Sequence, residues 1–409
     1  VQTKKEKSCC AESYERKKLG RKMKKVLIIT TVSGFVPQFE MNNVFILQEM
    51  GYEVHYASNF HNPHYGSDNH RLEETDIICH QIDFVRSPFH VAANLKAYRQ
   101  LCRLLQEQKF HFIHCHTPMG GVLGRLAAEQ NRRKRHSDCR VIYTAHGFHF
   151  FRGAPLINWI FYYPVEHWLA HFTDILITIN REDYQRAKRF QLREVKGKRG
   201  RVERVNGVGI DVTYYQRVTI DREAVRKRIG VKKGQLLFLS IGELNNNKNH
   251  KVMIEAIAKS KRDICYVICG EGKFKKVLEK LIKKYQLEDK VQLLGYRKDI
   301  PELLKASDLF VLPSFREGLS LSLQEAMACG IPVIASNIRG NRELIDRGKG
   351  GWLLHPKDKR GLVKIIQTLE KSNLTFMGDY NSKKIEAYDR KIMIEKMKKI
   401  YDSIDKEIL

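Results

Sequence analysis

The stretch that decides the fold is LFVLPSFREGLSLSLQEAMACGIPVI, residues 309–334. An apolar run over 309–312 predicts a buried strand that ends at Pro313, because proline cannot donate a hydrogen bond to a sheet. A glycine-containing loop then leads into a short helix closed by Gly330, and a second apolar run follows at 332–335. This order of strand, loop, helix and strand indicates a parallel sheet whose strands are connected by helices.

The same alternation runs along most of the chain in two series. The first series of predicted strands lies at 25–30, 53–57, 111–115, 140–144 and 174–179, with helical periodicity at 39–50 and 93–108. The second series lies at 236–240, 265–269, 291–294, 309–312 and 332–335. Two such series predict an α/β protein with two Rossmann-like domains, whose parallel sheets face an interdomain cleft.

Turn signals and charge suggest where the domains begin and end. Residues 1–22 lack apolar periodicity and carry eight Lys/Arg against three Glu, so we expect a disordered leader before Met23. A linker is expected near 205–216, which divides an N-terminal domain over 23–210 from a second domain over 211–381. The final segment, 382–409, is predicted to form basic amphipathic helices that pack back on the N-terminal domain.

Composition narrows the class of protein. The chain has 409 residues, of which 43% are hydrophobic, and this content excludes a disordered chain. Its 73 Lys/Arg and 46 Asp/Glu give a net charge of +27, which alone would favour nucleic acid or an anionic membrane as a partner. No RNA-binding, zinc-finger or helix-turn-helix pattern supports a nucleic-acid-binding protein. The segment 186–233 is the most basic, with 16 Lys/Arg against five Asp/Glu.

Cysteine usage indicates a reducing compartment. The nine cysteines are scattered and form no C-x-x-C pair. No apolar run reaches the ~18 residues of a membrane span, and the basic N-terminus lacks the apolar region of a signal peptide. We therefore expect a cytoplasmic protein.

The loop and helix after the 309–312 strand carry two carboxylates, Glu317 and Glu325, eight residues apart. Free amides of such a loop, together with the helix N-terminus, favour a diphosphate. A carboxylate in the helix can accept hydrogen bonds from a ribose diol. The alternatives are a solvated charge at Glu317 and a capping box in which Ser322 pairs with Glu325.

Gly34 follows the first predicted strand and would let the backbone approach a ligand, although an ordinary turn is the favoured reading of this glycine alone. The G-x-G-x-x-G fingerprint is absent after this strand, which argues against a dehydrogenase.

The region from Glu317 to Glu325 resembles the E-x7-E element of retaining, nucleotide-sugar-dependent glycosyltransferases of family 4, which adopt the GT-B fold. The resemblance extends from about Lys24 to about Pro356. Within this family, the chain is similar to the bacterial capsular and exopolysaccharide type. Further landmarks of this family occur in the expected order: Gly34, Tyr143 to Gly147 with His146, Ser240 to Gly242, Lys248 to His250, Gly270 to Gly272, Gly295 with Tyr296, and Asp308 to Ser314.

This resemblance implies that the protein transfers a hexosyl or N-acetylhexosaminyl group from a nucleotide-sugar, expected to be a UDP-sugar, with retention of configuration. Its implied catalytic residues are Glu317 at the donor sugar, Lys248 at the leaving diphosphate and His146 near the anomeric carbon. The implied donor-binding residues are Gly34, Gly242, Lys248, Tyr296, Arg297, Gly318, Leu319, Ser320 and Glu325. The family generally needs no metal, and the chain lacks D-x-D, so no metal or other cofactor is expected.

One position departs from the family pattern. Glu243 follows Gly242 where the family often has an arginine that pairs with the lysine on the diphosphate. This puts the usual two-cation clamp in doubt, and Lys248, loop amides and Arg316 or Arg339 are the candidates to compensate.

The implied acceptor is a polyprenyl-diphosphate-linked glycan in cell-surface polysaccharide biosynthesis, which would place the protein on the inner face of the membrane, at an anionic surface. An aromatic-rich run over 154–172 is a candidate lipid-facing surface, but a buried helix is the favoured interpretation. The helix over 93–108 is a second candidate. The alternatives are a transferase for a soluble acceptor, a GT-B UDP-sugar epimerase and a basic nucleic-acid-binding protein.

The pattern of histidines does not predict a metal site. His114 and His116 end a predicted strand, where alternation puts both side chains on one face. Two ligands are too few for a metal, and no third candidate is close in the sequence. A structural or cleft-lining role is therefore favoured for these histidines, and for His149.

Overall fold

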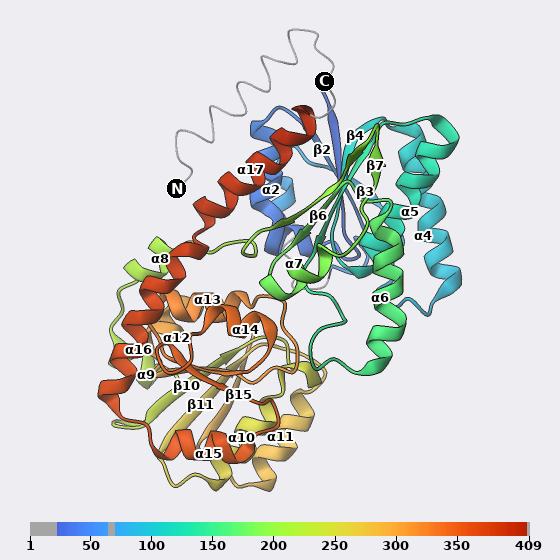
Figure 1. The fold of residues 1–409 in the computed structure, drawn as a ribbon. Helices are drawn as coiled ribbons and strands as arrows, with labels where there is room; N and C mark the ends of the chain where they lie inside the picture. Colours follow the sequence, from blue (N-terminus) through green and yellow to red (C-terminus); the bar gives the residue numbers. More distant parts are fainter. Residues whose placement is uncertain (1–22, 64–69, 407–409) are drawn as a thin grey trace. The chain divides into compact units, whose positions relative to one another are not determined.

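The computed structural model describes residues 23–63 and 70–406, so the expected leader over 1–22 lies outside the described residues. The chain forms two compact units (Figure 1). Unit 1 comprises the residues up to Val208 and those from Met393 onward, and unit 2 comprises Gly209–Ile392. The first boundary lies two residues before the expected one. The expectation for 382–409 needs a correction, because 382–392 belong to unit 2 and only the residues from Met393 onward join unit 1.

Unit 1 is built on a seven-stranded parallel sheet with the order β3-β2-β1-β4-β5-β6-β9. Its strands are β1 (Lys25–Ile29), β2 (Glu53–Ser58), β3 (Ile78–Gln81), β4 (Phe110–Cys115), β5 (Arg140–Ala145), β6 (Ile175–Thr178) and β9 (Arg201–Arg204). The chain first adds strands on one side of β1 and then returns to add β4 on the other side. In such sheets, ligands bind at the carboxyl ends of the strands where the order reverses.

Helices cover both faces of this sheet (Figure 1). The helical elements are η1 (Val36–Glu40), α2 (Met41–Glu49), α3 (His70–Glu73), α4 (Val91–Glu107), α5 (Pro118–Arg135), α6 (Leu156–Ala170), α7 (Arg181–Ala187) and α17 (Arg390–Lys406), and β7 (Glu194–Val195) pairs with β8 (Lys198–Arg199). Side chains of β1 alternate between two cores, with Leu27 in the cluster of α4 and α5 and Ile28 in the cluster of α2 and α17. Tyr401 on α17 lies in the second cluster, and its hydroxyl is 2.9 Å from Nδ1 of His114.

Unit 2 has a six-stranded parallel sheet in the order β12-β11-β10-β13-β14-β15, which is the doubly wound Rossmann order. Its strands are β10 (Leu236–Ile241), β11 (Ile264–Cys269), β12 (Val291–Gly295), β13 (Leu309–Leu312), β14 (Val333–Ser336) and β15 (Gly351–Leu354). Its helical elements are α8 (Val212–Arg217), α9 (Arg222–Arg228), η2 (Asn246–Lys248), α10 (His250–Lys259), α11 (Lys275–Lys284), α12 (Ile300–Ala306), α13 (Leu321–Ala328), α14 (Arg339–Leu344), α15 (Lys359–Gln367), α16 (Lys371–Lys384) and η3 (Ile385–Tyr388). The order of this sheet reverses between β10 and β13.

Every strand predicted from the sequence is present, with ends that differ by no more than one residue. The strands that the sequence analysis missed in the two large sheets are β3, β9 and β15, and each of them lies at an edge of its sheet.

The expectation of a buried helix over 154–172 is wrong for one face of α6. Only Leu169 and Ala170 are buried in this helix. The inner face, which includes Trp159, Tyr162 and Tyr163, packs partly buried against the core. The outer face is apolar and exposed, and it consists of Leu156, Ile157, Ile160, Phe161, Val165 and Trp168. The helix continues through Pro164, and no helix in the described part of the chain is long and apolar enough to cross a membrane.

Glycines allow the loops after β10 and β11 to lie against each other. A Cβ on Gly270 would lie 2.0 Å from the carbonyl oxygen of Gly242, and one on Gly272 would lie 2.3 Å from that of Leu244. Both glycines also have a positive φ, of +142° and +155°, which other residues rarely adopt. These backbone contacts therefore fix the shape of the carboxyl edge of the unit 2 sheet.

We expect Gly270→Ala to destabilise unit 2 by about 3 kcal/mol or more, because the methyl group overlaps backbone atoms that cannot move away cheaply. The matched control is Gly234→Ala, where φ is +83° but a Cβ would meet no atom within 4 Å. This control should cost about 1 kcal/mol, from backbone strain alone. Urea denaturation followed by circular dichroism measures the free energy of unfolding of both variants. An equal loss of stability in the two variants would contradict the close packing at Gly270.

Candidate active site

Lys248 and Glu317 meet at the point where the unit 2 sheet reverses its order. Lys248 ends η2, after β10, and Glu317 lies in the loop after β13. The Nζ of Lys248 is 2.9 Å from Oε1 of Glu317. Gly242 makes room for this lysine, since a Cβ there would be 2.7 Å from its Cε. The structure thus brings together two residues that are far apart in the chain and that the family resemblance implies as catalytic.

Asparagine side chains tie the loop of Lys248 to the loop of Glu317. Asn245 accepts a hydrogen bond from the backbone amide of Lys248 at 3.0 Å and so caps the turn. Asn247 donates to the carbonyl of Arg316 at 2.9 Å, and Asn249 donates to the carbonyl of Pro313 at 3.0 Å. Sequence reasoning missed Asn245 and Asn247 and gave Asn249 only as part of a family landmark, although a run of asparagines shortly after a strand is a visible signal for a side-chain-bonded loop.

The helix after this loop begins at Leu321 and is capped by Ser320, whose Oγ accepts a hydrogen bond from the amide of Leu323. The alternative of a capping box centred on Ser322 is therefore wrong, because Ser322 lies inside the helix. Gly318 precedes the cap and lies close to the next helix, since a Cβ on Gly340 would be 2.3 Å from its carbonyl oxygen.

Two features hold the rest of this loop in place. Arg339 at the start of α14 donates from Nε to the carbonyl of Glu317 at 3.4 Å. Leu319, directly before the cap, is partly buried and packs against the core of unit 2. The backbone on the way from Glu317 into α13 is therefore supported by neighbouring elements rather than by the loop alone.

Glu325 lies one turn inside α13 and accepts a hydrogen bond from the hydroxyl of Tyr215 at 2.8 Å. Burial raises the pKa of Glu325, and the Tyr215 hydrogen bond partly opposes this shift. Burial, together with the neighbouring carboxylate, also raises the pKa of Tyr215. Tyr215 comes from α8, and nothing in its local sequence marks it as a partner of Glu325.

Tyr296 and Arg297 follow β12, which β11 separates from β10. Tyr296 is exposed, whereas the guanidinium of Arg297 is held by Asp299, with Nε 2.8 Å from Oδ1. Hydrogen bonding to Asp299 also raises the pKa of Arg297. Glu243 stands where the family often has an arginine, and Arg316 is one of the residues expected to compensate. The structure leaves Arg316 exposed.

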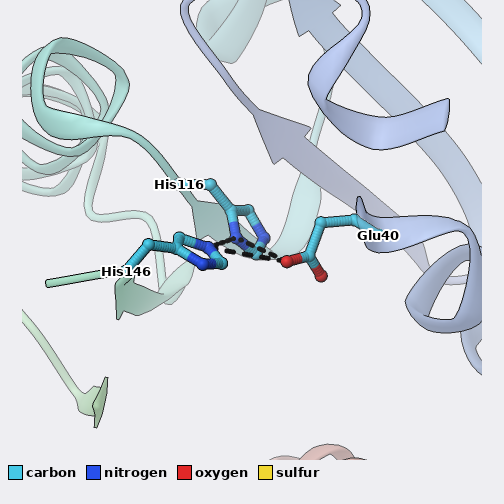
Figure 2. A group of neighbouring side chains, drawn as sticks. All are labelled: Glu40, His116 and His146. Atoms are coloured by element: carbon cyan, nitrogen blue, oxygen red, sulfur yellow. Dashed lines mark hydrogen bonds and ion pairs between the residues drawn. The ribbon is translucent and has the colours of Figure 1, made fainter. Parts of the chain in front are cut away.

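Unit 1 gathers a second group of polar side chains where its own sheet reverses order. His146 follows β5 and lies beside His116, with Nε2 3.1 Å from Nδ1 (Figure 2). Oε1 of Glu40 is 3.5 Å from each of these nitrogens. Gly34 lies after β1, where its amide donates to the carbonyl of Pro63 at 2.8 Å.

Burial controls the charges of this group. It raises the pKa of Glu40 to about 8, although the hydrogen bond from Asn43 acts in the opposite direction. Desolvation lowers the pKa of His146 to about 4 and that of His116 well below its ordinary value. His114 shares the face of His116, as predicted, with ring centroids 4.1 Å apart. In the sequence, His114 and His116 had no third ligand nearby, but in the structure Glu40 and His146 both lie beside His116.

Two doubly wound units of this kind define the GT-B class of glycosyltransferases. Comparison with known proteins agrees with this. Residues 221–390 match the model of the family "Glycosyl transferases group 1", and residues 45–199 match that of the "Glycosyl transferase 4-like domain". The chain belongs to this glycosyltransferase family, which confirms the predicted family, fold class and enzyme class.

Bacterial relatives include glycosyltransferases named for colanic acid and amylovoran biosynthesis. EpsD of Bacillus subtilis, provisionally named a glycosyltransferase, is 37% identical over 386 residues, which are 93% of this chain and 97% of EpsD. The Escherichia coli UDP-Gal:alpha-D-GlcNAc-diphosphoundecaprenol alpha-1,3-galactosyltransferase is 28% identical over 348 residues, 82% of this chain and 85% of that protein. The protein is thus a glycosyltransferase related to enzymes of exopolysaccharide and lipid-linked sugar synthesis.

Solved structures agree on the fold. HepE of Anabaena, in complex with UDP and glucose, superposes with a TM-score of 0.73 at 21% identity, covering 93% of this chain and all of HepE. WaaG, a glycosyltransferase involved in lipopolysaccharide biosynthesis, superposes with a TM-score of 0.68 at 16% identity, covering 92% of this chain and 99% of WaaG.

We expect Tyr215→Phe to destabilise the protein more at pH 8 than at pH 5. The pKa of Glu325 is raised, so more of this carboxyl than usual is protonated at pH 5, whereas the carboxylate that gains most from the tyrosine hydroxyl is present at pH 8. A hydrogen bond to a charged group contributes about 1.5–3 kcal/mol, and the loss at pH 8 should fall in this range. Urea denaturation at both pH values measures it.

The control for this prediction is Tyr214→Phe, because Tyr214 is the adjacent tyrosine and is exposed. Its effect should be small and should not depend on pH. A loss of stability in Tyr215→Phe that is the same at pH 5 and pH 8 would contradict the ionised state of Glu325 at the higher pH.

Proposed function

We propose that the protein transfers a hexosyl or N-acetylhexosaminyl group from a UDP-sugar to a polyprenyl-diphosphate-linked glycan, with retention at the anomeric carbon. The observation that carries this proposal is the Lys248–Glu317 pair at the reversal point of the unit 2 sheet. This reaction is a step in the synthesis of a capsular or other exopolysaccharide.

In this proposal, Lys248 stabilises the negative charge that develops on the leaving diphosphate. Fixed donors and positive charge directed at such a group contribute strongly to catalysis. The N-terminus of α13, with the backbone of Gly318, Leu319 and Ser320, adds amide groups and the positive end of the helix dipole. The transfer then needs no metal, because lysine and amides take the place of a divalent cation.

The other donor contacts are proposed from the family resemblance. Glu317, already held by Lys248, binds hydroxyls of the donor sugar, and Glu325 binds the ribose together with Tyr215. Tyr296 is exposed after β12 and is available to stack on the base, with Arg297 beside it. Gly242 and Gly34 let the backbone approach the donor, and His146 contacts the sugar. The UDP and UDP-glucose named in the HepE structures support a UDP-sugar as the donor.

The acceptor is proposed from the relatives and from α6. The Escherichia coli relative acts on a diphosphoundecaprenol-linked sugar, and a Campylobacter jejuni relative is named for a diphospho-undecaprenol acceptor. Crossover helices of a parallel sheet begin at the carboxyl edge of their strands. The exposed residues Leu156 and Phe161 in the first turns of α6 therefore lie toward the same sheet edge as His146, where a lipid-linked acceptor would approach.

We expect Lys248→Met and Glu317→Gln each to lower kcat/KM by about 100-fold or more, the usual effect of removing one group that stabilises developing charge. UDP release from a set of UDP-, GDP- and ADP-sugars with a polyprenyl-diphosphate-linked acceptor measures the rate. NMR of the product reports its anomeric configuration.

The matched control is the Lys275–Glu279 pair on α11, whose charged atoms are 4.0 Å apart on the surface. Lys275→Met and Glu279→Gln should leave kcat/KM near the wild-type value. Wild-type rates in folded Lys248→Met or Glu317→Gln would overturn the assignment of the site. Equal activity on soluble sugar acceptors would overturn the lipid-linked acceptor.

We expect Phe161→Glu to weaken binding to lipid vesicles about tenfold or more, because burial of a phenylalanine side chain contributes about 1.5–3 kcal/mol. Flotation with vesicles of phosphatidylcholine and phosphatidylglycerol measures the bound fraction. Phe161 is 60% exposed, and Phe376 on α16, which is 62% exposed, provides the control Phe376→Glu. Equal binding by the two variants would contradict the role of α6.

A further inference from the structure

Glu40, His116 and His146 bring three ligand-type atoms to one point in unit 1 (Figure 2). Glu40 ends η1 after β1, His116 follows β4 and His146 follows β5, so the carboxyl ends of three adjacent strands supply them. Oε1 of Glu40, Nδ1 of His116 and Nε2 of His146 form a triangle with sides of 3.5, 3.5 and 3.1 Å. The first two residues are buried, and His146 is partly exposed.

Hydrogen bonding alone does not account for this arrangement. An N–H···O bond normally spans about 2.7–3.2 Å, so the carboxylate oxygen at 3.5 Å is too far from both nitrogens for a good one. Nε2 of His116, which is not one of the three converging atoms, is buried without a hydrogen-bond partner among the described residues, so the polar neighbours of this ring lie at its Nδ1 side. His114 differs, because its two ring nitrogens lie 2.9 Å from the Tyr401 hydroxyl and 2.8 Å from Thr144 Oγ1.

The three distances fit a four-coordinate metal ion. Bonds of about 2.0–2.1 Å to zinc place the ligand atoms of a tetrahedron about 3.4 Å apart. Neighbouring ligands of a six-coordinate ion with bonds of this length would lie about 3.0 Å apart, which two of the three sides exceed by about 0.5 Å. A circle through the three atoms has a radius of about 2.0 Å, so an ion just outside their plane reaches all three.

We propose that Glu40, His116 and His146 bind a divalent transition metal ion of the zinc class, with one coordination position left for water. Two imidazoles and one carboxylate form a ligand set that zinc accepts with an open fourth position. A cavity of about 30 Å³, lined by Glu40, His146, Asn43 and Thr144 among others, has room for that water. Asn43 donates a hydrogen bond to the second carboxylate oxygen of Glu40 and so orients the ligand.

The electrostatics support this site. Among the ion pairs of the described residues, Glu40 is paired only with His116 and His146 and with no lysine or arginine. A divalent cation would supply the positive charge that this buried carboxyl group needs in order to act as a ligand. The ion would take up Nε2 of His146, a residue also proposed to contact the donor sugar, whereas Lys248 and Glu317 lie outside this group.

The chain provides a matched control in a second glutamate–histidine–histidine group. Nδ1 of His55 is 2.8 Å from Nε2 of His80, and Nε2 of His55 is 2.8 Å from Oε1 of Glu53. The two partners bind opposite sides of the His55 ring, so these three residues form a line and do not converge on one ion. Residue types are the same in both groups, but the geometry differs, and Glu53 also pairs with Lys25 at 3.2 Å.

The test measures Zn²⁺ binding to the full-length chain by competition with a chromophoric chelator, after removal of metal. We expect Glu40→Gln to weaken Zn²⁺ binding by about 100-fold or more, as loss of a direct ligand should cost at least as much as loss of an outer partner. Glutamine keeps the shape of the side chain, and circular dichroism checks the fold. His116→Gln should have a similar effect, and Glu53→Gln should have none.

Co²⁺ provides a second measurement that is independent of transferase activity. The wild-type protein should give the visible absorption of four-coordinate Co²⁺ without a thiolate charge-transfer band, and Glu40→Gln should lose it. Equal Zn²⁺ affinity in wild type and folded Glu40→Gln would overturn the site. A thiolate band that persists in Glu40→Gln would also overturn it, because the ion would then sit on cysteine.

Discussion

Backbone contact between loops at the carboxyl edge of the unit 2 sheet is the constraint on which the proposed donor site depends. The loop after β11 can touch the loop after β10 only because position 270 carries no side chain. The same holds where Gly340 meets the carbonyl of Gly318. These contacts support the loop of Lys248 and the loop of Glu317 from either side, and the side chains of Asn247 and Asn249 join the two loops. The ion pair therefore depends on how these loops are held as much as on the two charged residues.

The interior of both sheets could be predicted from the sequence because central parallel strands are buried on both faces and read as continuous apolar runs. The missed strands lack this signal. Ile78–Gln81 is mostly exposed, Arg201–Arg204 reads RVER, and Gly351–Leu354 is short and only partly buried beyond its first residue. Edge strands are held by backbone hydrogen bonds on one side, and side-chain patterns do not record those bonds.

Residues of the candidate active site could be predicted only where they belong to a family motif. Lys248 and Glu317 were named by family resemblance, and neither spacing nor periodicity places them together. Tyr215 and Glu40 were missed because their partners come from distant segments. Net charge shows the same limit, because several arginines of the basic segment 186–233 pair with carboxylates of the same chain. Arg193 pairs with Asp174, Arg226 with Asp308, and Arg228 with Asp299 and Glu302.

Unit 1 is assembled from both ends of the described chain, and this has a consequence for how the protein is made. Met393, Met397, Ile400 and Tyr401 complete the core beneath β1 and β2, yet they are translated after the whole of unit 2. On the ribosome, unit 2 can fold from one continuous segment, whereas unit 1 must wait with an apolar face uncovered. A chain that stops before α17 would therefore leave an apolar face of unit 1 uncovered.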